Sequence, residues 1–360
     1  MFQYDKPYND LPLLPPRVEI EEKEILKKAI SAGRQLAELK GLTYTIPNPE
    51  ILINTLTLQE ARISSEIENV WTTNERLLEA FSSTTQTLDA HTKEVLRYRE
   101  ALWDGYEMLA KRQILSTNLF IKTYQIIKTT TAGIRTTPGT KIINSLNEII
   151  YTPPEGFAVI NDKLKNLERF IHSDDNIDDL IKCALIHYQF EAIHPFTDGN
   201  GRTGRIINAL FLVLKNRLNI PVLYLSDYII KNKELYYKLI RNVTEKNDWK
   251  SWILYFLDAI EETATSTAQK IIEIKNLFNE TLGYAREKLP AYMYSKELVE
   301  LLFEKPYCKA QFLVEKNIAQ RQRAAVYLKE LEKIGILKSK KVGRENLFQN
   351  IKLYELLKSS

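Results

Sequence analysis

Apolar residues recur at intervals of three and four along most of the chain, which is the pattern of helices with one buried face. Residues 19–40 illustrate it, with Ile25, Leu26, Ala29 and Ile30 at helical spacing. The same spacing predicts helices over residues 51–68, 75–112, 115–127, 160–171, 177–191, 202–215, 229–243 and 248–280. The predicted fold class is therefore all-α.

A different pattern marks residues 141–151, a run rich in isoleucine. A Pro-Gly pair precedes it and a Pro-Pro pair follows it, so we predict a short β-hairpin set into the helical body. Residues 1–16 are rich in proline and are expected to be extended.

The last seventy residues change in character. Helical periods at 296–303, 314–316 and 319–335 lead into two short alternating runs, 336–341 and 345–348. Helices followed by a small hairpin are the order of a winged helix-turn-helix domain. We therefore divide the chain into an N-terminal helical region, a helical core, a connecting helix and a C-terminal winged-helix domain, at residues 1–112, 113–262, 263–288 and 289–360.

Composition narrows the class of protein. The 360 residues are 44% hydrophobic and 27% charged, as in soluble globular proteins. Two cysteines, Cys183 and Cys308, are too few for a disulfide framework or a CxxC-type zinc site, and they fit a reducing, cytoplasmic setting. The sequence lacks a secretory signal and a run of about 18 apolar residues, so we expect no membrane partner.

The formal net charge of +4 is unevenly distributed. From Arg286 onward there are 16 basic and 9 acidic residues, whereas the first 285 residues carry a net charge of −3. A basic end domain suggests nucleic acid or an acidic partner. The residues that would suit base edges and phosphates are Gln320, Arg321, Gln322, Arg323, Lys338, Lys340, Lys341 and Arg344. A structural role or a homodimer interface is the alternative.

The densest group of reactive side chains lies between two apolar helical runs, at residues 194–205 with the sequence HPFTDGNGRTGR. Glycines and a helix start form an anion site, onto which Arg202 and Arg205 can direct their guanidinium groups. Asp198 suits a divalent metal that bridges phosphate oxygens, and His194 suits a general base. The Asp-Gly-Asn-Gly turn alone could be a helix–helix connection, but the whole set favours a nucleotide-phosphate site.

This segment resembles the HxFx(D/E)GNGRxxR signature of Fic-domain proteins at every defined position. The resemblance continues in the preceding run LIHYQFEAIHPF, upstream in IRTTPGTKI and downstream in KELYYKLIRNVTEKNDWKSW. It implies an all-helical core with one hairpin, called the flap. It also implies transfer of AMP from ATP, with Mg²⁺, to a Ser, Thr or Tyr hydroxyl of a protein, which could be the chain itself.

The resemblance also implies residue roles. His194 would deprotonate the hydroxyl, Asp198 would bind Mg²⁺, and the side chain of Asn200 would help the loop backbone to hold phosphate. Arg205 would meet the γ-phosphate. The residues implied in the ATP site are Glu68, the flap residues Thr140, Lys141 and Ile142, the loop and helix residues Gly199, Asn200, Gly201, Arg202, Thr203, Gly204 and Arg205, and Tyr236 and Tyr237, which would line the nucleoside pocket. The target protein would pair along the flap at Thr140, Lys141 and Ile142.

A second match lies upstream. Residues 64–69, SSEIEN, fit the family's inhibitory pattern [S/T]xxxE[G/N], with Ser64 and Glu68 four apart on one helical face and Asn69 at a helix end. The resemblance implies that Glu68 pairs with Arg205 and takes the space of the γ-phosphate of ATP. In some relatives the same glutamate positions a water that removes AMP, so the reverse reaction stays open.

Two further interpretations remain at this stage. The same site could transfer another nucleotide or a phosphate, or the chain could be a DNA-binding regulator that uses its core as a nucleotide sensor. An intact His194 argues against pure binding, because phosphate binding needs no base. His187, Cys183, Trp249 and Trp252 are expected to be buried packing residues.

Overall fold

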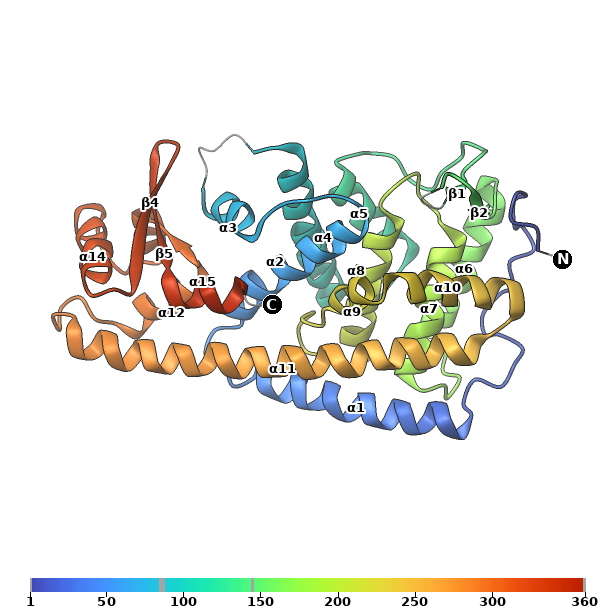
Figure 1. Cartoon of the computed structure of the whole chain (residues 1–360), viewed down its shortest axis with the longest axis horizontal. Coiled ribbons are helices and arrows are strands. Elements are labelled where there is room, and N and C mark those ends of the chain that lie inside the picture. Colours follow the sequence, from blue (N-terminus) through green and yellow to red (C-terminus); the bar gives the residue numbers. More distant parts are fainter. Residues whose placement is uncertain (1, 84–87, 144–145, 359–360) are drawn as a thin grey trace. The chain divides into compact units, whose positions relative to one another are not determined.

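The computed structural model describes residues 2–83, 88–143 and 146–358 (Figure 1). The chain falls into two compact units. One contains Met1–Glu38 and Arg97–Thr265, and the other contains Leu39–Leu96 and Ser266–Ser360. The four-part division predicted from the sequence cuts across these units, because residues 39–96 group with the C-terminal segment rather than with the rest of the N-terminal region.

The first unit is a helical body around one buried helix. Its own helices are α5 (Thr117–Lys128), α6 (Phe157–His172), α7 (Asp179–Ile193), α8 (Asn200–Leu214), α9 (Leu225–Lys231) and α10 (Lys233–Lys246). Helix α7 packs on α6 and α8, and every residue of α7 except Asp179 and Glu191 is buried. A helix that is buried on nearly every side lies at the centre of its fold. Asp178 caps it by accepting hydrogen bonds from the backbone N–H groups of Leu180 and Ile181.

The predicted hairpin is confirmed in the same unit. Strands β1 (Ile142–Ile143) and β2 (Ile149–Tyr151) pair antiparallel, with Ile142 opposite Tyr151. Within the described part of the chain, this sheet has two strands, so each strand has one open edge. Residues 144–145, which follow β1 in the sequence, lie outside the described residues.

The second unit combines helices from both ends of the chain with a small sheet. Its own elements are α2 (Pro49–Ile67), α3 (Asn74–Ser82), α12 (Lys296–Glu304), β3 (Tyr307–Cys308), α13 (Ala310–Glu315), α14 (Arg321–Lys333), β4 (Leu337–Val342), β5 (Glu345–Asn350) and α15 (Ile351–Lys358). The antiparallel strand order is β3-β5-β4, and Figure 1 shows β4 and β5 as a long hairpin. Helix α2 packs on α12, and α3 packs on β3. The predicted order of helices and hairpin is present, whereas β3 and α15 were not predicted.

Three long helices contribute residues to both units: α1 (Lys23–Thr43), α4 (Ala90–Arg112) and α11 (Trp249–Lys288). Within the described residues, none of the helices combines the length and the apolar character needed to cross a bilayer.

Two predicted helices are wrong in extent. The prediction of one helix over 75–112 fails because α3 ends before Ser83, whose backbone is extended, and Asp89 then accepts a hydrogen bond from the backbone of Thr92 near the start of α4. The predicted helix 229–243 is divided into α9 and α10 at Asn232, which leaves helical geometry with φ −120° and ψ 32°.

Candidate functional site

The reactive segment predicted from the sequence forms the connection between α7 and α8. His194 ends α7 in the left-handed region with φ 49°, and Gly199 starts α8 with φ 70°. A Cβ at Gly199 would lie 3.4 Å from Cδ of Lys128, so the turn needs glycine both for its backbone angle and for space. The start of α8 thereby presents N–H groups that no preceding turn can bond, next to a half-buried imidazole.

The loop is fastened from within by Asn200. The side-chain amide of Asn200 accepts a hydrogen bond from the backbone N–H of Phe196 and donates one to its carbonyl, both at 2.8 Å. Phe196 is fully buried and stacks on Tyr124 with ring centroids 4.3 Å apart. The amide predicted to help hold phosphate therefore has a structural task in the loop.

A second support, which sequence reasoning missed, comes from outside the loop. The buried guanidinium of Arg135 donates to the carbonyls of His194 at 2.8 Å and Pro154, and the backbone N–H of Arg135 donates to the carbonyl of Pro195 at 2.9 Å. Arg135 thus ties the end of α7 to the segment that follows the flap. Its residue type alone carries no signal of this role, although Arg135 lies in the run IRTTPGTKI, which is part of the resemblance to Fic-domain proteins.

Asp198 stands at the exposed side of the loop, with its side chain 59% exposed, beside two cations. Its carboxylate pairs with Nζ of Lys128 at 2.7 Å and lies 3.7 Å from Nη2 of Arg202. Burial raises the pKa of this carboxyl, but the hydrogen bond and charge of Lys128, with Arg202, lower it further than burial raises it, so the group is ionised.

These residues fit a magnesium ion that arrives with a nucleotide. In the described part of the chain, no cluster of three or more His, Cys, Asp or Glu side chains could hold a metal by itself. A single accessible carboxylate next to phosphate-binding groups is a common protein contribution to Mg²⁺, which takes its other ligands from phosphates and water. Lys128 would compete with the ion for Asp198.

The two arginines of the segment are both buried, Arg202 to 1% and Arg205 to 4% exposure. Below them, His187 is hydrogen-bonded to Asn208 through Nδ1 and to the hydroxyl of Tyr236 through Nε2, both at 2.8 Å. Burial, and then the charge of Arg205, lower the pKa of His187 to about 3, so the imidazole is neutral. The prediction that His187 is a buried packing residue is confirmed.

A pocket opens between the flap, the end of α7 and α10. Its lining includes Ile142 and Ile150 of the flap, Glu191 of α7, and Tyr236 and Tyr237 of α10. The pair of tyrosines predicted for the nucleoside pocket therefore lines a pocket with flap residue Ile142. Thr140 and Lys141 precede β1, half-buried and exposed respectively.

Gly204, on the second turn of α8, leaves room for the side chain of Glu191 on α7. A Cβ at this position would lie 2.5 Å from Oε1 of Glu191 and 3.1 Å from Cδ1 of Phe190. Glycine here keeps α7 and α8 close and leaves Glu191 in its place at the pocket.

The predicted inhibitory segment forms the end of α2 in the second unit. Ser64 is fully buried, Glu68 is the half-buried C-cap residue, and Asn69 follows in the left-handed region with φ 62°. The predicted helix end at Asn69 is confirmed, and asparagine there is one of the few residues that adopt this conformation readily.

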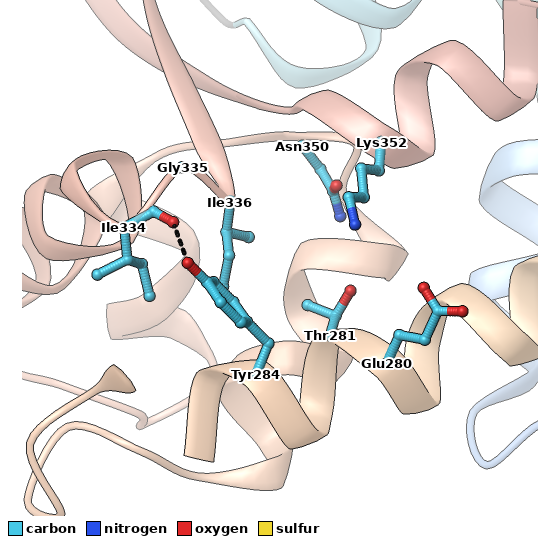
Figure 2. A pocket seen from close by; sticks show the side chains of 8 residues that line it. All are labelled: Glu280, Thr281, Tyr284, Ile334, Gly335, Ile336, Asn350 and Lys352. Carbon is cyan, nitrogen blue, oxygen red and sulfur yellow. Dashed lines mark hydrogen bonds between the residues drawn. The ribbon is translucent and has the colours of Figure 1, made fainter. Parts of the chain in front are cut away.

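A pocket of about 460 Å³ in the second unit holds none of the predicted site residues (Figure 2). In Figure 2 the hydroxyl of Tyr284, on α11, points to the carbonyl of Ile334 after α14, to which it donates at 3.0 Å. Lys352 and Asn350 line the opposite side.

Family models match most of the chain. The model described as Fic/DOC family N-terminal matches residues 26–107, and the model described as Fic/DOC family matches residues 114–212, which contain the whole reactive segment. The chain belongs to the Fic/DOC family. A third model, described as the C-terminal domain of SoFic-like protein adenylyltransferase, matches residues 277–353.

Individual Fic/DOC relatives match over limited lengths. The chain is 33% identical over 95 residues to a probable protein adenylyltransferase of Aquifex aeolicus, covering 26% of this chain and 27% of the relative. It is 27% identical over 145 residues to the protein adenylyltransferase Fic of Drosophila mojavensis, covering 38% of this chain and 27% of the relative. These alignments therefore span far less than two thirds of either relative.

The Fic/DOC assignment also agrees with a solved structure. A Fic family protein from Desulfovibrio desulfuricans G20 superposes with a TM-score of 0.57 at 14% identity, covering 93% of this chain and 97% of that one. At this identity the likeness is one of fold.

Proposed function

We propose that the chain is a protein adenylyltransferase, which transfers AMP from ATP to a Ser, Thr or Tyr hydroxyl of a protein. The observation that carries this proposal is one connection, from α7 to α8, that brings together an imidazole, an ionised carboxylate and two buried arginines. A pocket lined mainly by apolar and aromatic side chains, together with Glu191 and Arg241, lies at the end of the same α7. The names of the relatives support the same activity.

In this proposal His194 removes the proton from the target hydroxyl as its oxygen attacks the α-phosphorus of ATP. The new O–P bond forms while the bond to the β-phosphate oxygen breaks, and pyrophosphate leaves. Arg202 and Arg205 stabilise the charge that grows on pyrophosphate, and burial makes this interaction strong. Mg²⁺, held by Asp198, would neutralise phosphate charge when bound. Arg135 holds the carbonyl of His194 and thereby the position of the imidazole.

The target segment is proposed to add to the flap as a further strand. The open edge of β1 supports this, since an extended peptide can bond its backbone to an unpaired strand edge. The setting proposed for the reaction is the reducing cytoplasm, which agrees with Cys183 and Cys308 being buried free thiols.

The experiment that tests the activity compares ATP labelled at the α-phosphate with ATP labelled at the γ-phosphate. We expect protein-bound label from the first and none from the second, and none from either with His194→Ala. His172→Ala, a change at an exposed histidine of α6, is the matched control and should retain transfer. Label from the γ-phosphate would instead indicate a phosphotransferase, and an active His194→Ala protein would contradict the assigned base.

We infer further that Glu68 restrains this activity. The support is the sequence pattern of residues 64–69 and the defined helix end that it forms, with Asn69 in the left-handed region. A carboxylate that meets Arg205 would repel the γ-phosphate, and about 1.4 kcal/mol of repulsion already slows turnover tenfold. Glu68→Gly should therefore raise α-label incorporation about tenfold or more.

The matched control for this variant is Glu66→Gly, at the same helix end, where Glu66 pairs with Arg62 at 2.8 Å. Equal activation by both variants would indicate a loosened helix rather than a specific brake. Incubating AMP-modified protein with wild type and Glu68→Gly, and measuring released AMP, separates the forward from the reverse activity.

A further inference from the structure

An N-terminal strap, residues 2–14, runs along the first unit and is held there by polar side chains of the helical body. The buried Lys163 donates from Nζ to the carbonyl of Leu11 at 2.8 Å, and the buried Gln189 donates to that of Pro12 at 2.9 Å. Asn166 accepts from the N–H of Leu14 and donates to its carbonyl. Three side chains bonded to main-chain atoms give this part of the strap a fixed course.

The other end of the strap is tied to the segment that follows flap strand β2. The N–H of Tyr8 donates to the carbonyl of Thr152 at 3.0 Å, and Oγ1 of Thr152 donates to the carbonyl of Tyr4 at 2.7 Å. The N–H of Glu155 donates to Oδ1 of Asn9 at 2.8 Å. The strap therefore holds the flap through the segment that directly follows β2.

Aromatic contacts continue this attachment to the flap itself. The ring of Phe2 stacks on Tyr151, the last residue of β2, with centroids 5.8 Å apart, and meets Tyr8 edge-on at 5.1 Å. Tyr151 is anchored in turn, because its hydroxyl donates to the carbonyl of Ala192 at 2.8 Å. Phe2 is half-buried, whereas Tyr4 in the same strap is 58% exposed.

This arrangement brings Phe2 to the pocket between the flap and α10. Phe2 lines that pocket together with Ile142, Ile150, Tyr151, Tyr236 and Tyr237. Aromatic rings and branched aliphatic chains suit a flat heteroaromatic ring, which gains from stacking and from leaving water. We propose that Phe2 is a specificity-determining residue that contacts the base of the bound nucleotide, and that the strap holds Phe2 at the pocket.

This inference rests on the proposed function, because it takes the pocket to be occupied by the base of ATP. ADP is the appropriate probe, since it lacks the γ-phosphate that Glu68 is proposed to exclude. Inorganic pyrophosphate is the second probe, because it has the phosphates without a base.

The test measures the dissociation constants of both probes, in the presence of Mg²⁺, by calorimetry on the full chain with any affinity tag at the C-terminal end. Loss of one base–aromatic contact costs about 1–3 kcal/mol, so Phe2→Ala should weaken ADP binding by about tenfold. Pyrophosphate binding should be unchanged. Phe2→Tyr should restore ADP binding, and Tyr4→Ala, a change to an exposed aromatic residue of the same strap, should leave it unaffected.

Unchanged ADP binding in Phe2→Ala overturns the inference, and so does an equal weakening of ADP and pyrophosphate, which would indicate general damage to the loop. The two proposals fail in different ways. A wild-type chain that binds ADP but transfers no AMP contradicts the proposed function and leaves the contact with Phe2 testable. A wild-type chain that binds pyrophosphate but not ADP contradicts the base pocket itself.

Discussion

At the scale of single residues, the loop between α7 and α8 depends on Asn200. The side-chain amide of Asn200 forms hydrogen bonds with both the backbone N–H and the carbonyl of Phe196. These two hydrogen bonds hold the turn between Phe196 and Asn200. The sequence motif correctly marks this asparagine as part of the site. It cannot indicate that the amide faces the loop, because that depends on how Phe196 packs against Tyr124.

Asn200→Asp should therefore destabilise the loop, although it replaces only the NH₂ group of the side-chain amide by an oxygen. A carboxylate still accepts from the N–H of Phe196 but repels its carbonyl, and a buried polar group left without a partner costs about 1–3 kcal/mol. We expect the free energy of unfolding to fall by that amount in urea titrations, and ADP binding to weaken. Asn317→Asp, at an exposed turn, should change neither. An Asn200→Asp chain as stable as wild type would contradict the assigned task.

A second prediction at this scale concerns His187 and the pH dependence of stability. Its pKa is lowered to about 3 by burial and by Arg205, whereas an imidazole in the unfolded chain titrates near 6.5. Between these values the unfolded chain binds one more proton, so stability should rise with pH across this window by up to about 1.4 kcal/mol per unit. His187→Gln should flatten that slope in urea titrations from pH 4.5 to 7.5, whereas His172→Gln should not. Equal slopes in both variants would contradict a neutral buried His187.

At the scale of elements, the close packing of α7 against α8 depends on a glycine. A methyl group at Gly204 would meet the buried ring of Phe190 as well as the carboxylate of Glu191. By contrast, a methyl group at Gly283, inside α11, would have nothing within 4 Å.

Gly204→Ala should lower the free energy of unfolding by about 1–2 kcal/mol, because overpacking exceeds the gain in helix propensity. It should also weaken ADP binding, since Glu191 lines the pocket. Gly283→Ala should instead raise stability by about 0.5–1 kcal/mol. Thermal and urea unfolding of the two variants measure this contrast, and a stabilised Gly204→Ala chain would contradict the packing.

An element could be predicted from the sequence where neighbouring residues decide its ends, and could not where distant contacts decide them. Helix α2 ends where Asn69 adopts a left-handed backbone, a preference that the residue itself carries. The break between α9 and α10 has no proline or glycine to mark it, and β3 has two residues, too few for a pattern. The structural role of Arg135 could not be predicted, because its carbonyl partners on His194, Pro195 and Pro154 lie between 19 and 60 residues away in the sequence.

At the scale of the whole molecule, the basic charge of the C-terminal segment is partly neutralised within its own unit. Lys340 pairs with both Glu75 and Glu79 of α3. Arg321 and Arg323 at the start of α14 stay exposed, as does Arg344 between β4 and β5. The sequence could show the excess of charge but not which lysines already have acidic partners.

DNA binding by this segment accordingly remains a prediction with a defined test. Replacing Arg321 and Arg323 by glutamate should weaken binding to pooled DNA fragments and reduce its salt dependence, by about 0.9 in the slope of log K against log salt for each lost contact. Lys340→Gln should change binding little, because its charge is paired. Binding that is indifferent to salt would contradict phosphate contacts.

The whole chain is proposed to act as one enzyme whose site is restrained by Glu68. The most direct test of this activity and its restraint is intact mass spectrometry of wild type, Glu68→Gly and His194→Ala after incubation with ATP and Mg²⁺. We predict a mass increase of one or more AMP groups, larger for Glu68→Gly than for wild type and absent for His194→Ala. No AMP adduct on Glu68→Gly, either on itself or on proteins of a cell extract, would contradict the account, as would an equal adduct on His194→Ala.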